Sequence, residues 1–380
     1  RELGPRSLVE YAARHGGNTL SAREIRHVAV RDVGERFDDR SPKRTVAEQA
    51  RQQNERRGHE SSGKSRILRV YVISVRVPYR RIRALTPRRH FPMSKNLQVL
   101  LASRPTGGVT ESHFQLVERD IPEPQPGEIL VRNHWLSLDP YMRGRMSASK
   151  SYAASVEIGD VMVGGTVGEV IESKHVRFKT GDFVAGGLGW QLYALSNGEG
   201  LAKVDPNLVP LSTYLGVVGM PGATAWTGLM EICQPQAGET VVVSAASGAV
   251  GGVVGQLAKM QGCRAVGIAG GKAKCEYAVK ELGYDACIDY KAGRLYEELK
   301  QACPGGIDCY FENVGGPTMD TVFRLLNPFS RVALCGLISD YNLEDPYGVK
   351  MIRSILVNRV KMQGFIVNDR MDIYQKAIRK

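Results

Sequence analysis

The fold of this chain is decided by one stretch, Ser244-Ala245-Ala246-Ser247-Gly248-Ala249-Val250-Gly251-Gly252. It follows three consecutive valines and opens a run of helical periodicity that extends to Gln261. A small, glycine-rich turn between a buried strand and a helix lets backbone N–H groups approach a pyrophosphate at the positive end of the helix. Ala246 stands where the G-x-G-x-x-G fingerprint has its first glycine, so a purely structural turn stays open as the alternative.

On both sides of this stretch, apolar strand-like runs alternate with helical periodicity. The predicted helices include 249–261 and 274–282, and the predicted strands are 240–244, 265–269, 286–290, 308–314, 331–335 and 361–367. Six strands spaced by helices are typical of a doubly wound parallel sheet. We therefore expect a cofactor domain of the α/β Rossmann type over residues 213–380.

The end of the second predicted strand indicates which dinucleotide binds. An NAD site carries Asp or Glu there, to accept hydrogen bonds from the ribose 2′-hydroxyl. This chain has Ala269-Gly270-Gly271-Lys272-Ala273-Lys274 instead, with two cations placed to receive a 2′-phosphate. Solvated lysines are the alternative, but cations at a helix start are unfavourable without a ligand. The pattern therefore favours NADP(H).

Residues 93–212 show a different pattern, with short β-like runs punctuated by Gly and Pro. Examples are the runs 128–131, 165–171 and 182–185, the first of which follows a proline-rich turn. This pattern predicts a β-rich, barrel-like domain. The region has no Cys, and its three histidines, His113, His134 and His175, are scattered singly. A zinc site needs three or four clustered ligands, so we predict no metal.

The first 92 residues form a basic leader. They hold 22 Lys and Arg against 10 Asp and Glu, whereas the other 288 residues hold 29 of each, so the leader carries the whole net charge of +12. Apart from an alternating stretch at 67–77, hydrophobic periodicity is poor, and we expect most of the leader to be disordered. A nucleic-acid-binding arm and a transit peptide are less favoured alternatives. Since the first methionine is Met93, we favour a leader that is not native to the protein.

Cysteine usage and hydropathy bear on location. All seven cysteines lie between Cys233 and Cys335, their number is odd, and no two form a C-x-x-C motif. This usage favours reduced thiols and a cytoplasmic protein. The uncharged run from Val241 to Ala258 is rich in Gly, Ser and Ala and lacks aromatic belts, so we interpret it as a buried strand and helix rather than a membrane span.

Five segments resemble one family of proteins, in order and at that family's spacing. They are Leu136–Met146 (LSLDPYMRGRM), Gly219–Ala225 (GMPGATA), Ser247–Val250 (SGAV), Phe311–Gly316 (FENVGG) and Cys335–Asn342 (CGLISDYN). Residues 93–380 thereby resemble the zinc-free prostaglandin-reductase, leukotriene-hydroxydehydrogenase and bacterial curcumin-reductase branch of the medium-chain dehydrogenase/reductases. The resemblance implies that the β-rich domain is GroES-like. It also implies that this chain, which stops at Lys380, lacks the family's C-terminal return to that domain.

The resemblance also implies a set of cofactor contacts. The pyrophosphate would lie against the glycine-rich turn, the 2′-phosphate against Lys274 and Tyr290, and the nicotinamide and its ribose against three further segments. The implied residues are Ser247, Gly248, Ala249, Val250 and Gly251 for the first group, and Asn313, Cys335, Gly336, Leu337, Ile338, Ser339, Tyr341, Phe365, Ile366 and Val367 for the last. Tyr141 would face the substrate, with Tyr341 and Tyr347 as further candidates.

The implied chemistry is transfer of a hydride from NADPH to the β-carbon of an α,β-unsaturated aldehyde or ketone. The implied small-molecule partner is thus an enal or enone, and family precedent adds a homodimer. A quinone reductase on the same fold is the alternative within enzymes. Outside them, the chain could be a catalytically silent NADPH-binding protein, or a nucleic-acid binder through its leader. The sequence does not name the physiological substrate.

Overall fold

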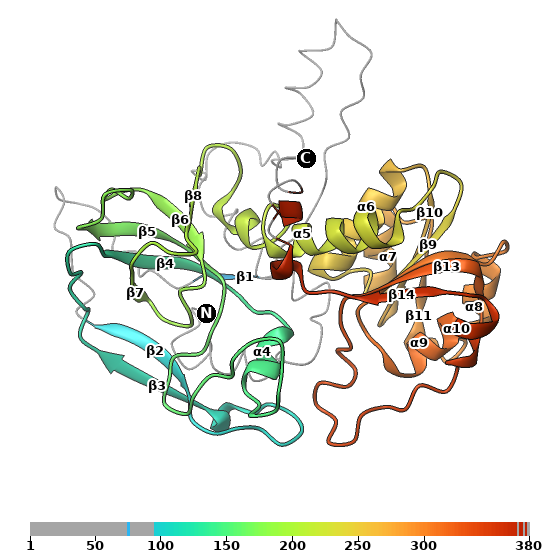
Figure 1. Cartoon of the computed structure of the whole chain (residues 1–380), viewed down its shortest axis with the longest axis horizontal. Coiled ribbons are helices and arrows are strands. Elements are labelled where there is room, and N and C mark those ends of the chain that lie inside the picture. Colours follow the sequence, from blue (N-terminus) through green and yellow to red (C-terminus); the bar gives the residue numbers. More distant parts are fainter. Residues whose placement is uncertain (1–73, 77–94, 371, 375–376, 378–380) are drawn as a thin grey trace, which may run out of the picture.

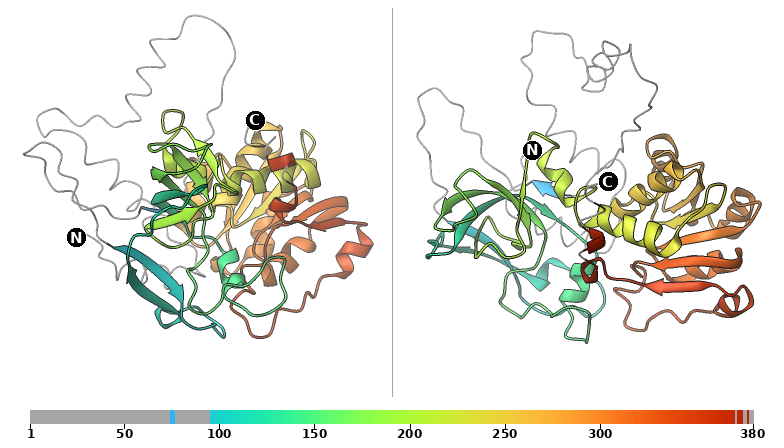
Figure 2. Two further views of the ribbon diagram at one scale, coloured as in Figure 1. Left: turned by 60° about the vertical axis from the view of Figure 1, so that its left-hand side comes forward. Right: turned by 45° about the horizontal axis from the view of Figure 1, so that its top comes forward.

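The computed structural model describes residues 74–76, 95–370, 372–374 and 377, which form two parts (Figure 1). One part is built on an antiparallel sheet and the other on a parallel sheet, and the two stand side by side in Figure 1 and in the right-hand view of Figure 2. The predicted order, a β-rich part followed by a doubly wound parallel sheet, is confirmed. The leader expected over residues 1–92 lies outside the described residues except for Ser74–Arg76, which forms the short strand β1.

The antiparallel sheet has the strand order β1-β4-β5-β6-β8, and β7 pairs with β4. Its strands are β4 (Ile129–Ser137), β5 (Thr166–Ser173), β6 (Phe183–Gly186), β7 (Tyr193–Ser196) and β8 (Ala202–Val204). A hairpin of β2 (Asn96–Leu101) and β3 (Phe114–Arg119) lies beside it. Glycine is required at position 168, where β5 pairs with β4, because a Cβ there would lie 2.4 Å from the carbonyl oxygen of Arg132.

The parallel sheet has the order β11-β10-β9-β12-β13-β14. Its first strand in the sequence, β9, is central; the chain adds β10 and β11 on one side and then β12, β13 and β14 on the other. Its strands are β9 (Thr240–Ser244), β10 (Arg264–Ala269), β11 (Ala286–Asp289), β12 (Ile307–Glu312), β13 (Leu326–Leu334) and β14 (Lys361–Gly364). Its helices are α6 (Ala249–Met260), α7 (Lys272–Lys280), α8 (Leu295–Ala302), α9 (Gly316–Phe323) and α10 (Arg353–Val357).

The sheet is buried on both faces, which explains the run of valines in β9. Val241 and Val243 pack into the apolar cluster formed with α6 and α7, whereas Val242 packs into the cluster formed with α8 and α9. A strand covered on both faces has no polar side to alternate with. The first cluster also takes in α5 (Met220–Trp226) and the π-helix η3 (Thr227–Cys233), through Ala225 and Leu229.

All six predicted strands of the parallel sheet exist, but their ends differ from prediction. β13 begins at Leu326 rather than residue 331, and β14 ends at Gly364 rather than residue 367. In the β-rich part, the sequence analysis did not identify β2, β3, β7 or β8. The burial pattern of β3 has no fully buried position, so its sequence carries no strong alternation to detect.

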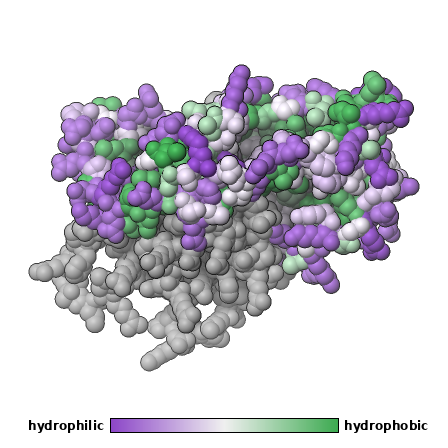
Figure 3. All heavy atoms as spheres, turned by 90° about the horizontal axis from the view of Figure 1, so that it is seen from below, coloured by the Kyte–Doolittle hydropathy of each residue, from purple (hydrophilic) through white to green (hydrophobic). Residues whose placement is uncertain are grey.

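The uncharged run from Val241 to Ala258 forms β9 and most of α6, and the greater part of its apolar residues are buried in the core. Among the described residues, no helix is long and apolar enough to cross a membrane. The face seen in Figure 3 carries small apolar patches among hydrophilic side chains. The prediction that residues 241–258 form a buried strand and helix therefore agrees with their place in the fold.

Candidate active site

The glycine-rich turn lies between β9 and α6, at the carboxyl end of the parallel sheet. Gly248 is the N-terminal cap of α6, and its N–H donates to the carbonyl oxygen of Ala245 at 2.9 Å. A Cβ at Gly251 would lie 2.4 Å from that same oxygen, so only glycine allows the helix to approach the turn. The first N–H groups of an α-helix have no partner within the helix, and at the start of this twelve-residue helix they suit a phosphate. The turn thus fits the pyrophosphate that the sequence predicts.

Ala245 adopts an unusual backbone conformation in this turn. Its φ is +50°, a left-handed value that costs a non-glycine residue about 1–2 kcal/mol. Ala246, which replaces the first glycine of the fingerprint, is fully buried, and a Cβ at Gly267 of β10 would meet its methyl group at 2.6 Å. Glycine at 267 therefore makes room for alanine at 246.

The candidate 2′-phosphate site lies at the end of β10. Lys274 is in the first turn of α7 and is only 7% exposed, while Tyr290 follows β11 and is 43% exposed. A Cβ at Gly270 would lie 2.9 Å from the Tyr290 ring and 3.1 Å from Cε of Lys291. The structure thus brings Tyr290 to the Gly270 turn and adds Lys291. Sequence reasoning missed Lys291 because it follows the third strand rather than the second.

A carboxylate also reaches this edge of the sheet. Asp289 pairs in register with Ala269, the last residue of β10. Its Oδ1 accepts the N–H groups of Gly271, at 2.7 Å, and Lys291, at 3.0 Å. The sequence analysis looked for acidic residues on the second strand alone and did not consider this one. Its position as acceptor for two backbone donors gives Asp289 a role in shaping the turn.

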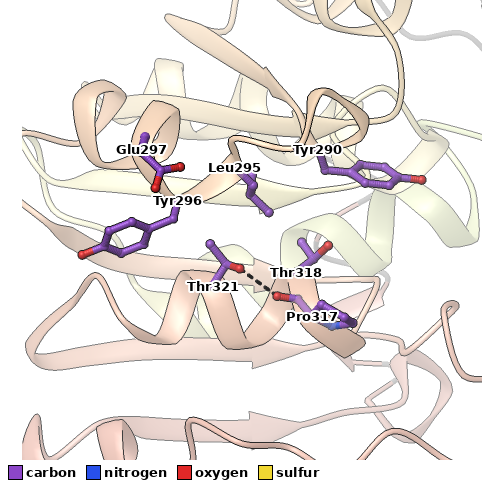
Figure 4. A pocket seen from close by; sticks show the side chains of 8 residues that line it. Tyr290, Leu295, Tyr296, Glu297, Pro317, Thr318 and Thr321 are labelled. Atoms are coloured by element: carbon purple, nitrogen blue, oxygen red, sulfur yellow. Dashed lines mark hydrogen bonds between the residues drawn. The ribbon is translucent and has the colours of Figure 1, made fainter.

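A hollow of 380 Å³ borders the same region, between the segment that leads into α8 and the helix α9 (Figure 4). Its lining residues are Tyr290, Gly293, Leu295, Tyr296, Glu297, Pro317, Thr318 and Thr321. Thr321 donates its hydroxyl to the carbonyl oxygen of Pro317 at 2.8 Å. Since Tyr290 lines the hollow and also covers Gly270, this space adjoins the candidate 2′-phosphate site.

Three turns meet beside the glycine-rich turn and are tied together by hydrogen bonds. Asn313 donates its side-chain amide to the carbonyl oxygen of Ser244 at 2.8 Å, and its backbone N–H to the Ser244 hydroxyl at 2.8 Å. Cys335 and Gly336 both donate backbone N–H groups to the carbonyl oxygen of Glu312. The ends of β9, β12 and β13 therefore form one frame, which contains Asn313 and the start of the 335–341 turn.

The 335–341 turn is fixed by its own side chains. Ser339 donates its hydroxyl to the carbonyl oxygen of Val314 at 2.6 Å, and the Tyr341 hydroxyl accepts the N–H of Leu337 at 3.3 Å. Burial raises the pKa of Cys335 to about 12. Nearby, Phe365 lies edge-on to Phe311, with ring centroids 6.3 Å apart. The residues 335–341 and 365 thus lie on the parallel-sheet side of the site.

Tyr141 comes from the other part of the molecule. It begins the short helix α4 (Tyr141–Arg145), and its ring packs against the cluster that contains Met142 and Trp190. Burial raises the pKa of Tyr141, and the Asp139 carboxyl adds to the rise. Burial also raises the pKa of Asp139, to about 6. The phenol of Tyr141 therefore stays protonated, and a hydrogen-bond donor, well above neutral pH.

Tyr152 lies near both Tyr141 and Tyr341, and the sequence analysis missed it. Burial raises the pKa of Tyr152, and that of Tyr341 for the same main reason. Proximity to Tyr152 contributes to the raised pKa of both Tyr141 and Tyr341. Tyr152, which is 60% exposed, therefore lies close enough to influence both a tyrosine eleven residues before it and one from the parallel-sheet part. Tyr152 lies in a loop with no motif around it, so only the fold identifies it.

A hydrogen bond between side chains links the two parts at this point. Arg143 of α4 donates from Nε to Oδ1 of Asn342 at 3.1 Å, although the two residues are 199 positions apart. The same guanidinium donates from Nη2 to the carbonyl oxygens of Pro105 and Gly107. Arg143 is two residues from Tyr141, and Asn342 follows Tyr341. This bond therefore joins the two segments that carry the candidate tyrosines.

Tyr347 is placed differently from the other candidates. Its hydroxyl donates to Oδ2 of Asp320 on α9 at 2.8 Å, and this bond raises the pKa of Tyr347. Asp320 also accepts the backbone N–H groups of Lys350 and Met351. Tyr347 therefore anchors the loop that precedes α10, and the structure does not bring it together with Tyr141.

Comparisons with known proteins agree with this arrangement. A family described as the N-terminal domain of oxidoreductases matches residues 97–204, and one described as zinc-binding dehydrogenases matches residues 249–380. The NADPH-dependent curcumin reductase of Escherichia coli (strain K12) is 49% identical over 278 residues, which cover 72% of this chain and 81% of that protein. The chain belongs to the medium-chain dehydrogenase/reductases.

Other relatives of this medium-chain dehydrogenase/reductase extend the likeness. Prostaglandin reductase 1 of Rattus norvegicus is 44% identical over 72% of this chain and 82% of that protein. The crystal structure of CurA from Vibrio vulnificus in complex with NADPH matches with a TM-score of 0.71 and 50% identity, over 74% of this chain and 86% of that one. Quinone oxidoreductase from Escherichia coli, 19% identical with a TM-score of 0.57, shares the fold alone.

One of the two family descriptions names zinc. Within the part of the chain that the structure describes, no group of three or more His, Cys, Asp or Glu side chains could hold a metal ion. His113 instead contacts Thr110, His134 lies 3.6 Å from Glu169, and His175 accepts a backbone N–H. The described residues of this medium-chain dehydrogenase/reductase therefore do not fit a zinc site.

Proposed function

We propose that the protein is an NADPH-dependent reductase that transfers a hydride to the β-carbon of α,β-unsaturated aldehydes and ketones. The observation that carries this proposal is the protonated phenol of Tyr141, two residues from Arg143, whose guanidinium bonds to Asn342 on the parallel-sheet side. The proposal is supported by relatives named curcumin reductase, 2-alkenal reductase and prostaglandin reductase 1. The reaction consumes one NADPH and one proton and yields NADP⁺ and the saturated carbonyl compound.

We propose that the cofactor is held entirely by the parallel-sheet part. Its pyrophosphate would lie on the backbone of Ser247 to Gly251, and its 2′-phosphate between Lys274 and Tyr290, with Lys291 close by. The nicotinamide side would meet Asn313, the segment from Cys335 to Ser339 with Tyr341, and the segment from Phe365 to Val367. When bound, NADPH supplies the hydride.

Tyr141 would act on the substrate. As hydride adds to the β-carbon, negative charge develops on the carbonyl oxygen, and a donor already in place stabilises this charge more than it stabilises the ground state. The raised pKa of Tyr141 keeps its proton available for that hydrogen bond. The α-carbon would then take a proton from Tyr141 or from water. Tyr152 and Tyr341 would line the same space.

The direct test is consumption of NADPH, measured at 340 nm across a panel of enals, enones and quinones. Saturation of the C=C bond, identified by mass spectrometry of the product, supports the proposal. Turnover restricted to quinones would replace it with the quinone-reductase alternative. Tight NADPH binding with no turnover of any panel member would identify a silent cofactor-binding protein.

We expect Asn342→Ala to lower kcat/KM for an enone by roughly 10- to 150-fold, because a hydrogen bond to a charged group is worth about 1.5–3 kcal/mol. The affinity for NADPH, measured by fluorescence titration, should change little, since Asn342 lies outside the proposed cofactor contacts. The matched control is Leu343→Ala, which truncates an exposed neighbour on the same loop. An equal loss in NADPH affinity would mean that Asn342 shapes the cofactor site instead.

We further propose a cytoplasmic homodimer. The location is supported by the seven cysteines, all of which are free thiols. The dimer is supported by β14, the edge strand of the parallel sheet, whose four residues are all exposed. β14 itself contributes the exposed Met362, and the exposed apolar side chains of Ile352, Leu356 and Val357 precede it in the chain. A two-fold axis at this edge would pair β14 with its copy and cover these side chains.

Leu356→Lys should therefore convert the dimer to a monomer, because it places a charge in the centre of the proposed contact. Leu356 is 79% exposed, so the change should not disturb the fold of the single chain. Light scattering coupled to size-exclusion chromatography measures the mass directly. Val176→Lys is the control, since this 96% exposed residue lies on the β-rich part. A wild-type protein that elutes as a monomer would rule out the dimer.

A further inference from the structure

Glu312 is a fully buried carboxylate at the centre of the candidate site. It is the last residue of β12, next to β9, where the strand order of the sheet reverses. Burying a charged group without a partner of opposite charge is expensive. None of the ion pairs among the described residues includes Glu312. The fold therefore retains a costly group at the point where doubly wound sheets bind their ligands.

The hydrogen-bond partners of Glu312 suit its ionised form. Oε1 accepts the hydroxyl of Ser244 at 2.7 Å and the N–H of Gly315 at 3.1 Å, together with the N–H of Val314. Oε2 accepts the hydroxyl of Tyr310. All four neighbours are donors, and a carboxylate is an acceptor alone, whereas a protonated carboxyl would bring a donor of its own. Burial raises the pKa of Glu312, and these hydrogen bonds oppose that rise.

Hydrogen bonding alone does not explain why a charge stands here. A glutamine has the same shape, and its side-chain oxygen could accept the same three donors as Oε1. Its amide nitrogen could donate to the Tyr310 hydroxyl, which is able to accept as well. A neutral residue would therefore join the same turns without a buried charge. The feature left to explain is the negative charge itself.

The charge is felt at the turn proposed to frame the nicotinamide. The backbone oxygen of Glu312 receives the N–H groups of Cys335, at 2.9 Å, and Gly336, at 3.1 Å. After burial, the charge of Glu312 is the second cause of the raised pKa of Cys335. The nicotinamide ring is neutral in NADPH and positively charged in NADP⁺. A negative charge beside this turn would therefore discriminate between the two forms of the cofactor.

We propose that the buried negative charge of Glu312 makes the site prefer NADP⁺ over NADPH more strongly than the same fold would with a neutral side chain. This inference rests on the proposed NADPH-dependent function. Its consequence for catalysis is that positive charge developing on the ring as the hydride departs is met by a fixed negative charge in a site shielded from water. The positively charged nicotinamide ring of NADP⁺ would then be the counter-charge that Glu312 lacks within the protein.

The test measures dissociation constants for NADP⁺ and NADPH separately, by calorimetry, in the wild type and in Glu312→Gln. We expect the affinity for NADP⁺ to fall about tenfold relative to that for NADPH, as for the loss of one unit charge at partly shielded range. The control is Tyr310→Phe, which keeps the charge and removes one donor, and should retain the wild-type ratio. Circular dichroism verifies that each variant is folded.

If the ratio of the two dissociation constants is unchanged in folded Glu312→Gln, the inference is overturned. This includes the case in which both cofactors bind more weakly by the same factor. If Glu312→Gln does not fold, Glu312→Asp provides the second test, because it keeps the charge and breaks the hydrogen-bond geometry. Retention of the wild-type ratio in Glu312→Asp supports the inference, and collapse of the ratio contradicts it. A wild-type protein that binds neither cofactor refutes the proposed function instead, so the two failures are distinguishable.

Discussion

Tyr141→Phe should lower kcat for enone reduction by up to about 10²–10³-fold, the effect typical of one lost oxyanion donor. The variant keeps the ring that packs against Met142 and Trp190 and removes only the hydroxyl, so the fold should be unaffected. The affinity for NADPH should stay the same, because Tyr141 lies on the β-rich part and the proposed cofactor contacts lie on the other. Steady-state kinetics with a saturating enone, together with an NADPH titration, separate these two quantities.

Tyr214→Phe is the matched control for this prediction. It removes a phenol that bonds to the backbone of Asp205, away from the site, and kcat should remain at the wild-type value. An unchanged kcat in Tyr141→Phe would return Tyr141 to the role of a packing residue. Stabilisation of the oxyanion would then be assigned to Tyr152 or to the cofactor's ribose hydroxyl.

Lys274→Ala should weaken the binding of NADPH by roughly 10- to 150-fold and change the binding of NADH little. A hydrogen bond to a charged group is worth about 1.5–3 kcal/mol, and only NADPH carries the 2′-phosphate that would receive it. Lys274 is almost fully buried, which fixes its side chain and makes it a better ligand than a solvated lysine. Competitive titration of the two cofactors measures the difference.

Lys272→Ala separates a specific contact from general loss of positive charge at the start of α7. The Lys272 side chain is 89% exposed, and its ion pair with Glu276 is a long one, at 4.0 Å. Its removal should therefore weaken NADPH binding much less than Lys274→Ala does. Equal weakening of NADPH and NADH in Lys274→Ala would contradict the assignment. It would indicate that Lys274 supports the turn at Gly271 rather than the phosphate.

Burial on both faces made the parallel sheet predictable from the sequence. The valines of β9, the small residues that follow and the regular helix spacing all indicate a doubly wound parallel sheet. Local patterns of this kind can be recognised without knowing which distant residues are in contact. The ends of strands were less predictable. Leu326 begins β13 because Ile307 of β12 pairs with it across an irregular register, and no local signal in the sequence marks that pairing.

The candidate site could be predicted only where it lies within one motif. The glycine-rich turn, Lys274 and Tyr141 each stand in a recognisable segment. Asp289, Lys291 and Tyr152 reach the site from neighbouring strands or from a loop, and their approach depends on register and on packing between the two parts. Tyr347 shows a different limit of prediction from sequence. The family resemblance made it a candidate, whereas in the fold its hydroxyl donates to Asp320.

Division of the site between the two parts has a consequence for how the protein responds to its cofactor supply. Every proposed cofactor contact lies between residues 244 and 367, within the parallel-sheet part. A ligand stabilises only what it binds, by about 2.7 kcal/mol at a concentration one hundred times its Kd. Cofactor-rich conditions would therefore protect one part against heat and proteolysis and leave the β-rich part to rely on its own core. Loss of activity would then report the melting of the β-rich part, while the part that binds the cofactor is still folded.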